Sequence, residues 1–216
     1  MKIADVTSRL REQLDERLSA DGFKFRKTNA EYVRKQGDLR YIFRLGIHAM
    51  TDWFLVTPVA FVGSTVINKA FNEILGRNIS TSGSTCGFGI GNECNHQRGR
   101  YQIETEDDIL ASGAAIWRDY AEVAAPFYES VNSMEGIDGY MNSIHENRHT
   151  AGSVGNACMG LIVAKMVGNP RFNELADTYY DFWAKTQSLA IAADILTVRK
   201  ALEGTNEITR WERQRN

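Results

Sequence analysis

The first residues of the chain carry apolar side chains at the spacing of an amphipathic helix. Because an α-helix turns once every 3.6 residues, positions three and four apart share one face. The residues that recur at this spacing are Ile3, Val6, Leu10, Leu14 and Leu18. Asp21 and Gly22 follow the stripe, and this pair is typical of a helix end. The pattern predicts one helix whose stripe faces a core.

The pattern then changes to the two-residue alternation of half-buried strands. The segments FKFRKT and AEYVRKQ are followed by a Gly37-Asp38 turn and then by LRYIFRLGIHA. In that last segment the apolar residues that alternate are Leu39, Tyr41, Phe43, Leu45 and Ile47. WFLVTPVAFVG is apolar on both faces, which indicates a central strand with a lost hydrogen bond or a bulge at Pro58.

Helical spacing returns at 66–75 and ends at Gly76. The Ser-, Gly- and Asn-rich stretch 77–99 predicts a hairpin or long loop around TCGFGIG, and RYQI predicts a returning strand. Thr105 resembles a helix N-cap followed by an acidic first turn. Further helices are predicted near 106–122, 127–143, 153–167 and 171–203.

Strands followed by a block of helices predict an α+β fold, not a doubly wound sheet. We expect an N-terminal helix, an antiparallel sheet of about four to six strands and a C-terminal helical block. Residues 1–104 would form the helix and sheet, and residues 105–216 would form the helical block packed on them in one compact domain.

Charge is unevenly distributed along the 216 residues, although the net charge is only −2. Residues 1–48 hold 11 Lys and Arg against 7 Asp and Glu, whereas residues 101–146 hold 10 acidic residues against Arg118 alone. Such an acidic block is ordinarily a solvated helical surface. It can also be matched to a basic partner, because complementary fields speed association. The predicted partner-binding residues are Glu104, Glu106, Asp107 and Asp108.

Targeting signals and cysteine usage favour a cytoplasmic protein. No run approaches the roughly 20 apolar residues that a membrane-spanning helix needs, and the charged first segment is unlike a signal peptide. Cys86, Cys94 and Cys158 make an odd number, which favours free thiols. The spacing of Cys86, Cys94 and His96 does not match a structural zinc site, and a cysteine nucleophile paired with His96 would require the two to meet in space.

The pentapeptide HENRH is the sharpest chemical signal. Two histidines four apart on a helix can hold zinc while the intervening glutamate activates water. NELAD downstream resembles the zinc-ligand segment of thermolysin-like peptidases. That resemblance implies His145, His149 and Glu174 as metal ligands and Glu146 as the catalytic base.

The preceding helix argues against this zinc site. The apolar residues Ile137, Tyr140, Met141 and Ile144 share one face, and Arg148 would fall in the middle of it. Burying an unpaired guanidinium is costly, so we expect the helix to stop near residues 144–146. We therefore predict no metal and no cofactor, and retain a zinc-dependent hydrolase as the alternative.

A weaker alternative is nucleic-acid binding. Trp211 lies among arginines near the C-terminus, where it could stack on a base. The basic strand residues that could contact phosphates are Arg26, Lys27, Arg34, Lys35, Arg40 and Arg44. Such charges more often mark the solvent face of an antiparallel sheet.

Residues 1–145 resemble a group of small, uncharacterised bacterial α+β proteins. The likeness is carried by a leading helix, GFKFRKTNAEYVRKQGDLRYIF, an apolar strand, a short helix and a later RYQI. Such proteins look like toxin-immunity proteins, which inhibit a toxin by binding it. The resemblance implies no catalytic residues. We accordingly expect a non-enzymatic, cytoplasmic binding protein that occludes a protein partner, in preference to an enzyme or a nucleic-acid-binding protein.

Overall fold

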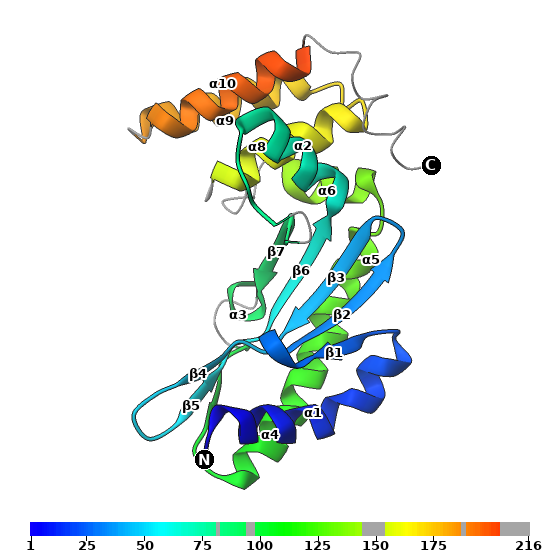
Figure 1. Ribbon diagram of the computed structural model, residues 1–216, viewed down its shortest axis with the longest axis vertical. Coiled ribbons are helices and arrows are strands. Elements are labelled where there is room, and N and C mark those ends of the chain that lie inside the picture. The colour runs from blue at the N-terminus through cyan, green and yellow to red at the C-terminus, as the bar shows by residue number, and fades with distance from the viewer. Residues whose placement is uncertain (81–82, 94–97, 144–153, 187–188, 204–216) are drawn as a thin grey trace. The chain divides into compact units, whose positions relative to one another are not determined.

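A computed structural model describes residues 1–80, 83–93, 98–143, 154–186 and 189–203 (Figure 1). The chain divides into two compact units. The first comprises Met1–Gly63 and Gly87–Glu129, and the second comprises Ser64–Cys86 and Ser130–Asn216. The N-terminal helix, the antiparallel sheet and the C-terminal helices confirm the predicted α+β class.

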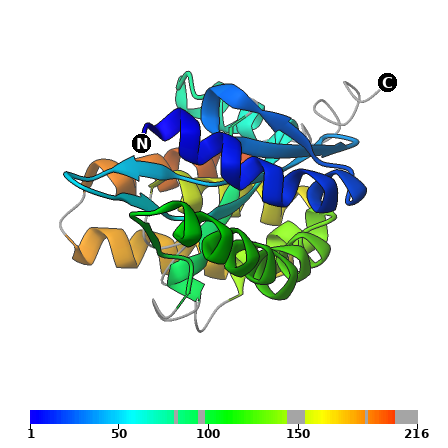
Figure 2. The same cartoon turned by 90° about the horizontal axis from the view of Figure 1, so that it is seen from below.

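Helix α1 (Ile3–Ala20) buries the predicted stripe with one exception. Val6, Leu10, Leu14 and Leu18 are fully buried, as the spacing predicts. Ile3 is 45% exposed, because it lies in the first turn and lines a surface groove instead of the core. The helix packs beside α4 (Glu106–Asp119), and Figure 2 shows the two lying side by side.

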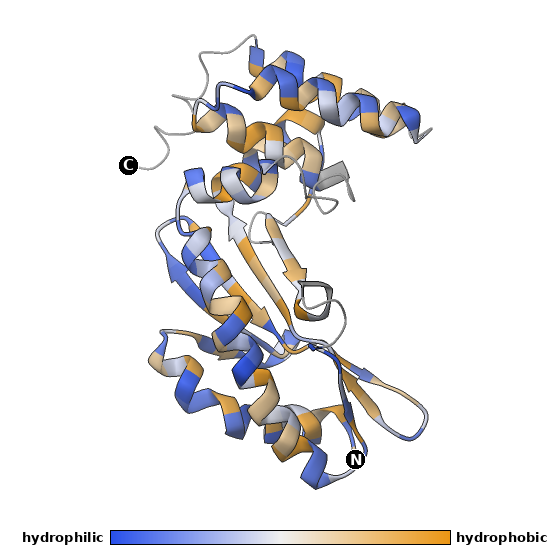
Figure 3. Ribbon diagram, turned by 180° about the vertical axis from the view of Figure 1, so that it is seen from behind, coloured by the Kyte–Doolittle hydropathy of each residue, from blue (hydrophilic) through white to orange (hydrophobic). Residues whose placement is uncertain are grey.

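The main sheet has five strands in the order β1-β2-β3-β6-β7. Their bounds are β1 Lys24–Arg26, β2 Glu31–Gln36, β3 Leu39–Arg44, β6 Val59–Ser64 and β7 Cys86–Gly89. The register of the first three strands places Glu31 between Arg26 and Arg44. Figure 3 shows β6 and β7 as the more hydrophobic, orange part of this sheet. The 3-10 turn η1 (Lys27–Asn29) joins β1 to β2.

A second sheet has three strands in the order β4-β5-β8. They are β4 (Ile47–Ala49), β5 (Phe54–Val56) and β8 (Tyr101–Ile103), paired antiparallel. The segment predicted as one strand through Ile47 therefore breaks at Gly46, and the segment predicted as one central strand breaks at Thr57 and Pro58. Both breaks transfer the chain from one sheet to the other.

Gly46 makes this transfer sterically allowed. Its φ is +55°, a left-handed conformation that side chains disfavour. A Cβ atom added at Gly46 would lie 2.4 Å from the carbonyl oxygen of Thr57. The Thr57 backbone N–H donates to the Gly46 carbonyl at 3.0 Å, so the two crossing segments are held together.

Helix α2 (Thr65–Leu75) ends at Gly76, as predicted, with Gly76 in the left-handed conformation. The segment TCGFGIG, expected in a hairpin or long loop, contains strand β7 followed by the start of the short helix α3 (Ile90–Glu93). Its first glycine, Gly87, has a φ of +147° and passes so close to β6 that an added Cβ would lie 2.2 Å from the Ala60 carbonyl oxygen.

The helical break expected between residues 122 and 127 is absent. Helix α4 continues through the π-helical turn η2 (Tyr120–Ala124) into α5 (Ala125–Ser130). Pro126 lacks an N–H and crowds the carbonyl one turn earlier. We attribute the wider π turn to this crowding, since it lets the chain stay helical. The Tyr120 ring of this turn packs against Phe23, which directly precedes β1, and against Phe43 of β3.

The second unit is mainly helical. Its later helices are α6 (Met134–Asn142), α8 (Val154–Met166), α9 (Phe172–Lys185) and α10 (Leu189–Glu203). The helix predicted over 171–203 is therefore two helices. No described helix of either unit is long and apolar enough to cross a bilayer. The compact units group α4 with the sheet and α2 with the later helices, and the division into domains at residue 104 stays a prediction.

Candidate functional site

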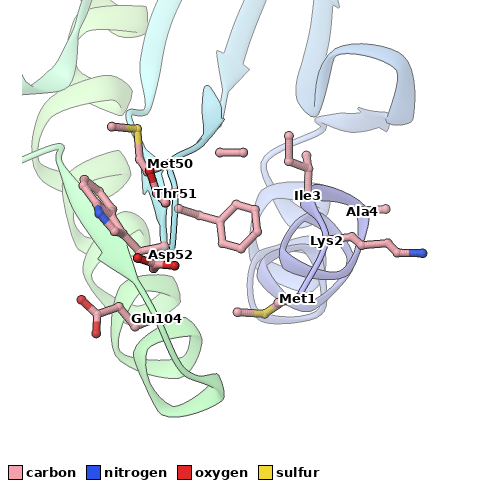
Figure 4. Close-up of a pocket in the computed structure, with 11 residues that line it drawn as sticks. Met1, Lys2, Ile3, Ala4, Met50, Thr51, Asp52 and Glu104 are labelled. Atoms are coloured by element: carbon pink, nitrogen blue, oxygen red, sulfur yellow. The ribbon is translucent and has the colours of Figure 1, made fainter.

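The first unit has a groove of about 610 Å³ on its surface. Residues 1–4 at the start of α1, residues 49–54 of the β4–β5 hairpin and Glu104 line it. Figure 4 shows Met1 extending from α1 toward the hairpin, while the Lys2 side chain points away from it. The groove therefore lies between one helix end and one hairpin tip.

The hairpin tip is held by a tight turn. The Met50 backbone N–H donates to the Trp53 carbonyl at 2.8 Å, and Ala49 and Phe54 face each other below the turn. Phe54 also pairs with Ile103 of β8, the strand that leads directly to Glu104. The short three-stranded sheet thus places the hairpin tip and Glu104 beside the same groove.

Large apolar side chains are exposed at the groove. Met1, Ile3 and Met50 are 52%, 45% and 46% exposed, and Trp53 is half-buried. Spacing along the sequence does not reveal these residues as a site, because Ile3 fits the stripe of the helix. A signal was present in MTDW, since turns ordinarily hold Gly, Asn, Asp, Ser or Pro and not Met and Trp.

Carboxylates accompany these apolar side chains. Asp52 and Glu104 both line the groove, and Asp52 and Glu104 are both exposed. The Gln102 side-chain amide donates to Glu104 at 2.5 Å, which orients that carboxylate. A site with an apolar floor and two carboxylates can take an apolar side chain that has a cation next to it.

The other predicted partner-binding residues have different roles. Asp107 is exposed. Glu106 is also exposed and forms a surface ion pair with Arg9 of α1 at 3.2 Å. Exposed ion pairs of this kind contribute little to stability. Glu106 can therefore exchange Arg9 for a cation of a partner at little cost.

Asp108 caps its own helix. It accepts hydrogen bonds from the backbone N–H groups of Thr105 and Glu104 at 2.8 and 3.0 Å and from the Thr105 hydroxyl. The Asp108 N–H donates in return to the Thr105 hydroxyl, which confirms the predicted N-cap. These bonds, led by the Thr105 backbone N–H, lower the pKa of the Asp108 carboxyl.

Further acidic residues of the block are structural. Asp119 is fully buried and accepts hydrogen bonds from the Gly99 backbone N–H at 3.1 Å and from the Tyr101 hydroxyl. In the second unit Asp138 is buried and accepts from the Asn142 side chain at 2.7 Å. The acidic surface is therefore smaller than the sequence count suggests, because Asp119 and Asp138 are buried.

The basic strand residues separate onto two faces of the main sheet. Arg34 lies over the rings of Phe23 and Tyr41, on the face that contacts the helices. Lys27 lies in the turn η1. The remaining four predicted residues, Arg26, Lys35, Arg40 and Arg44, are on the opposite face. Lys24 lies on that face as well.

The zinc alternative is only partly within the described residues. His145, Glu146, Arg148 and His149 lie outside them. Glu174 lies in the first turn of α9, where it accepts two hydrogen bonds of 2.9 Å from Arg171. Across the described ranges no three His, Cys, Asp or Glu side chains are grouped to hold a metal ion. The zinc hydrolase stays a prediction.

The described cysteines are unsuited to nucleophilic chemistry. Cys86 and Cys158 are both free and buried. Burial raises the pKa of each thiol to about 12, so both are protonated at neutral pH. Cys94 and His96 lie outside the described residues, as does Trp211.

Comparison of this chain with known protein families, with curated proteins and with solved structures finds no match. What the groove binds is therefore inferred from its own residues.

Proposed function

We propose that this chain is a non-enzymatic binding protein of immunity type, which neutralises a protein partner in the bacterial cytoplasm by covering its active surface. The observation that carries the proposal is the groove of the first unit, where exposed Met1, Ile3 and Met50 lie beside Asp52 and Glu104. Residues 1–145 resemble small bacterial α+β proteins that look like immunity proteins, and this resemblance supports the same function.

The groove combines the two features that protein interfaces need. Side chains such as Met and Trp supply affinity when they are desolvated by a partner. Carboxylates at the rim supply orientation and faster association with a basic surface. The partner segment would carry an apolar side chain next to lysine or arginine, and Glu106 and Asp107 would extend the acidic contact along α4.

Co-expression with the product of the adjacent gene tests the proposal. We expect the two proteins to co-purify, and this chain to restore growth to cells in which that product is toxic. If no complex forms and growth is not restored, the proposal is wrong.

A pair of matched variants locates the interface. Replacing Ile3 and Met50 together by alanine should weaken the complex by about 30-fold or more, as expected for interface residues that supply most of the affinity. The control replaces Leu189 and Leu196 of α10, which are 73% and 45% exposed, by alanine. An equal loss of affinity in the control would show that the groove is not the interface.

A further inference from the structure

The exposed face of β1–β3 carries five cations around a small apolar centre. Antiparallel register pairs Lys24 with Val33, Lys35 with Arg40, and Glu31 with both Arg26 and Arg44. Paired residues lie on the same face of a sheet, and so do residues two apart along a strand. Val33 and Ile42 form the centre and are buried. The cations that surround it are Lys24, Arg26, Lys35, Arg40 and Arg44, of which Arg40 is mostly buried and Arg44 is partly exposed.

Within the described part of the first unit, the helices contact the other face of these strands. Tyr32 donates to Asp15 of α1 at 2.9 Å, and Tyr41 packs edge-on against Tyr128 of α5. Lys24, Arg26 and Lys35 are exposed on the opposite face.

One buried carboxylate organises this face. The Glu31 side chain is 1% exposed and accepts from Arg44 at 2.9 Å, and Arg40 lies 3.6 Å from its other oxygen. Burial lowers the pKa of the Arg40 guanidinium; Glu31 raises it, and the nearby charges of Arg26 and Arg44 lower it. Among the register-paired residues of this face, Glu31 is outnumbered by five cations.

We propose that this face binds the phosphate backbone of a nucleic acid. Each cation that contacts a phosphate releases condensed counterions, which favours binding without any apolar anchor. A protein partner would gain little here, because affinity between proteins depends on desolvated aromatic or apolar anchors and exposed ion pairs contribute little. The face has no exposed aromatic ring among its paired residues, so phosphate contact and not base stacking is expected.

Fluorescence anisotropy with a labelled duplex DNA of mixed sequence, about 20 base pairs long, tests this proposal on the full chain. We expect binding at about 50 mM salt that weakens steeply toward about 200 mM. Replacing Lys24 and Lys35 by glutamate should weaken binding at least about tenfold and lower the slope of log K against log salt by about two.

The control replaces Lys185 and Lys200, exposed lysines of α9 and α10, by glutamate and so changes the net charge equally. An equal loss in this control would overturn the proposal, because the effect would then follow net charge and not the face. Tighter binding to polyglutamate than to the duplex would also overturn it, in favour of an acidic protein segment. If circular dichroism shows that the glutamate variant is not folded, Lys24 and Lys35 are replaced by glutamine instead, and the same outcomes decide.

Discussion

The groove and the basic face lie on the same unit but use opposite chemistry. The groove combines exposed apolar side chains with Asp52 and Glu104, and these carboxylates stand at its surface. The basic face has cations at its surface and the carboxylate of Glu31 buried beneath them. A carboxylate thus serves recognition in the first case and internal support in the second. The difference shows that local charge predicts a partner only when burial is known.

The largest expected effect separates these two carboxylates. Glu31→Gln should lower the free energy of unfolding by about 2–3 kcal/mol, because Arg40 and Arg44 lose the buried counter-charge that they share. Glu104→Gln should change it by less than about 0.5 kcal/mol, as surface substitutions usually do. Urea denaturation measures both, and equal losses would contradict the contrast.

The second prediction concerns the link between the main sheet and the groove. Gly46→Ala should lower the free energy of unfolding by more than about 2 kcal/mol, because a left-handed alanine is strained and its Cβ would meet Thr57. Gly37→Ala is the control, since Gly37 has a φ of +58° with open space around it. The control should cost about 1 kcal/mol, the strain alone. A larger loss of unfolding free energy for Gly37→Ala than for Gly46→Ala would contradict the close approach of Gly46 to Thr57.

A smaller effect is expected at the cap that leads from the groove into α4. Thr105→Ala should lower the free energy of unfolding by about 1 kcal/mol, since the Asp108 N–H loses its acceptor. Thr178→Ala should cost less, because the Thr178 hydroxyl bonds only to a carbonyl within its own helix. Thermal unfolding of the two variants measures the difference. A larger destabilisation by Thr178→Ala than by Thr105→Ala would contradict the prediction.

The smallest effect is pH-dependent. The pKa of Asp108 is lower in the folded chain than its ordinary value of 3.8, so ionised Asp108 stabilises the folded state above that value. This contribution is lost as the pH falls from 3.8 through the lowered pKa of the folded state. The difference in thermal midpoint between the natural chain and Asp108→Asn should therefore shrink over that acidic range. A difference that grows there would have the wrong sign.

Local patterns predicted most of the elements because each signal is local. The stripe of α1, the stop at Gly76 and the Thr105 cap depend on residues within a few positions of one another. The split of the strands at Gly46 and Pro58 was not predicted, since it depends on which sheet each half pairs with. The π turn before Pro126 was not predicted either: a proline ordinarily ends a helix, and here the wider turn lets the helix continue.

The sequence pattern selected one residue of the groove, and the partner-binding role of the selected residues stays a prediction. Glu104 was selected from the acidic block and lies at the groove, whereas Asp108 was selected with it and acts as a cap. Ile3 and Met50 were not selected, because an exposed apolar residue looks like a core residue when only its spacing is known. The faces of Arg34 and Arg40 were likewise set by strand register, which requires both strands of a pair.

The crossing of Gly46 and Thr57 makes the β4–β5 hairpin an insertion that leaves the five-stranded sheet and rejoins it at neighbouring points. Its four tip residues can therefore be exchanged without altering the strand pairing that supports the core. A family of variants could acquire new partners by drift at this tip alone, and a library built there would be a practical route to redirected recognition.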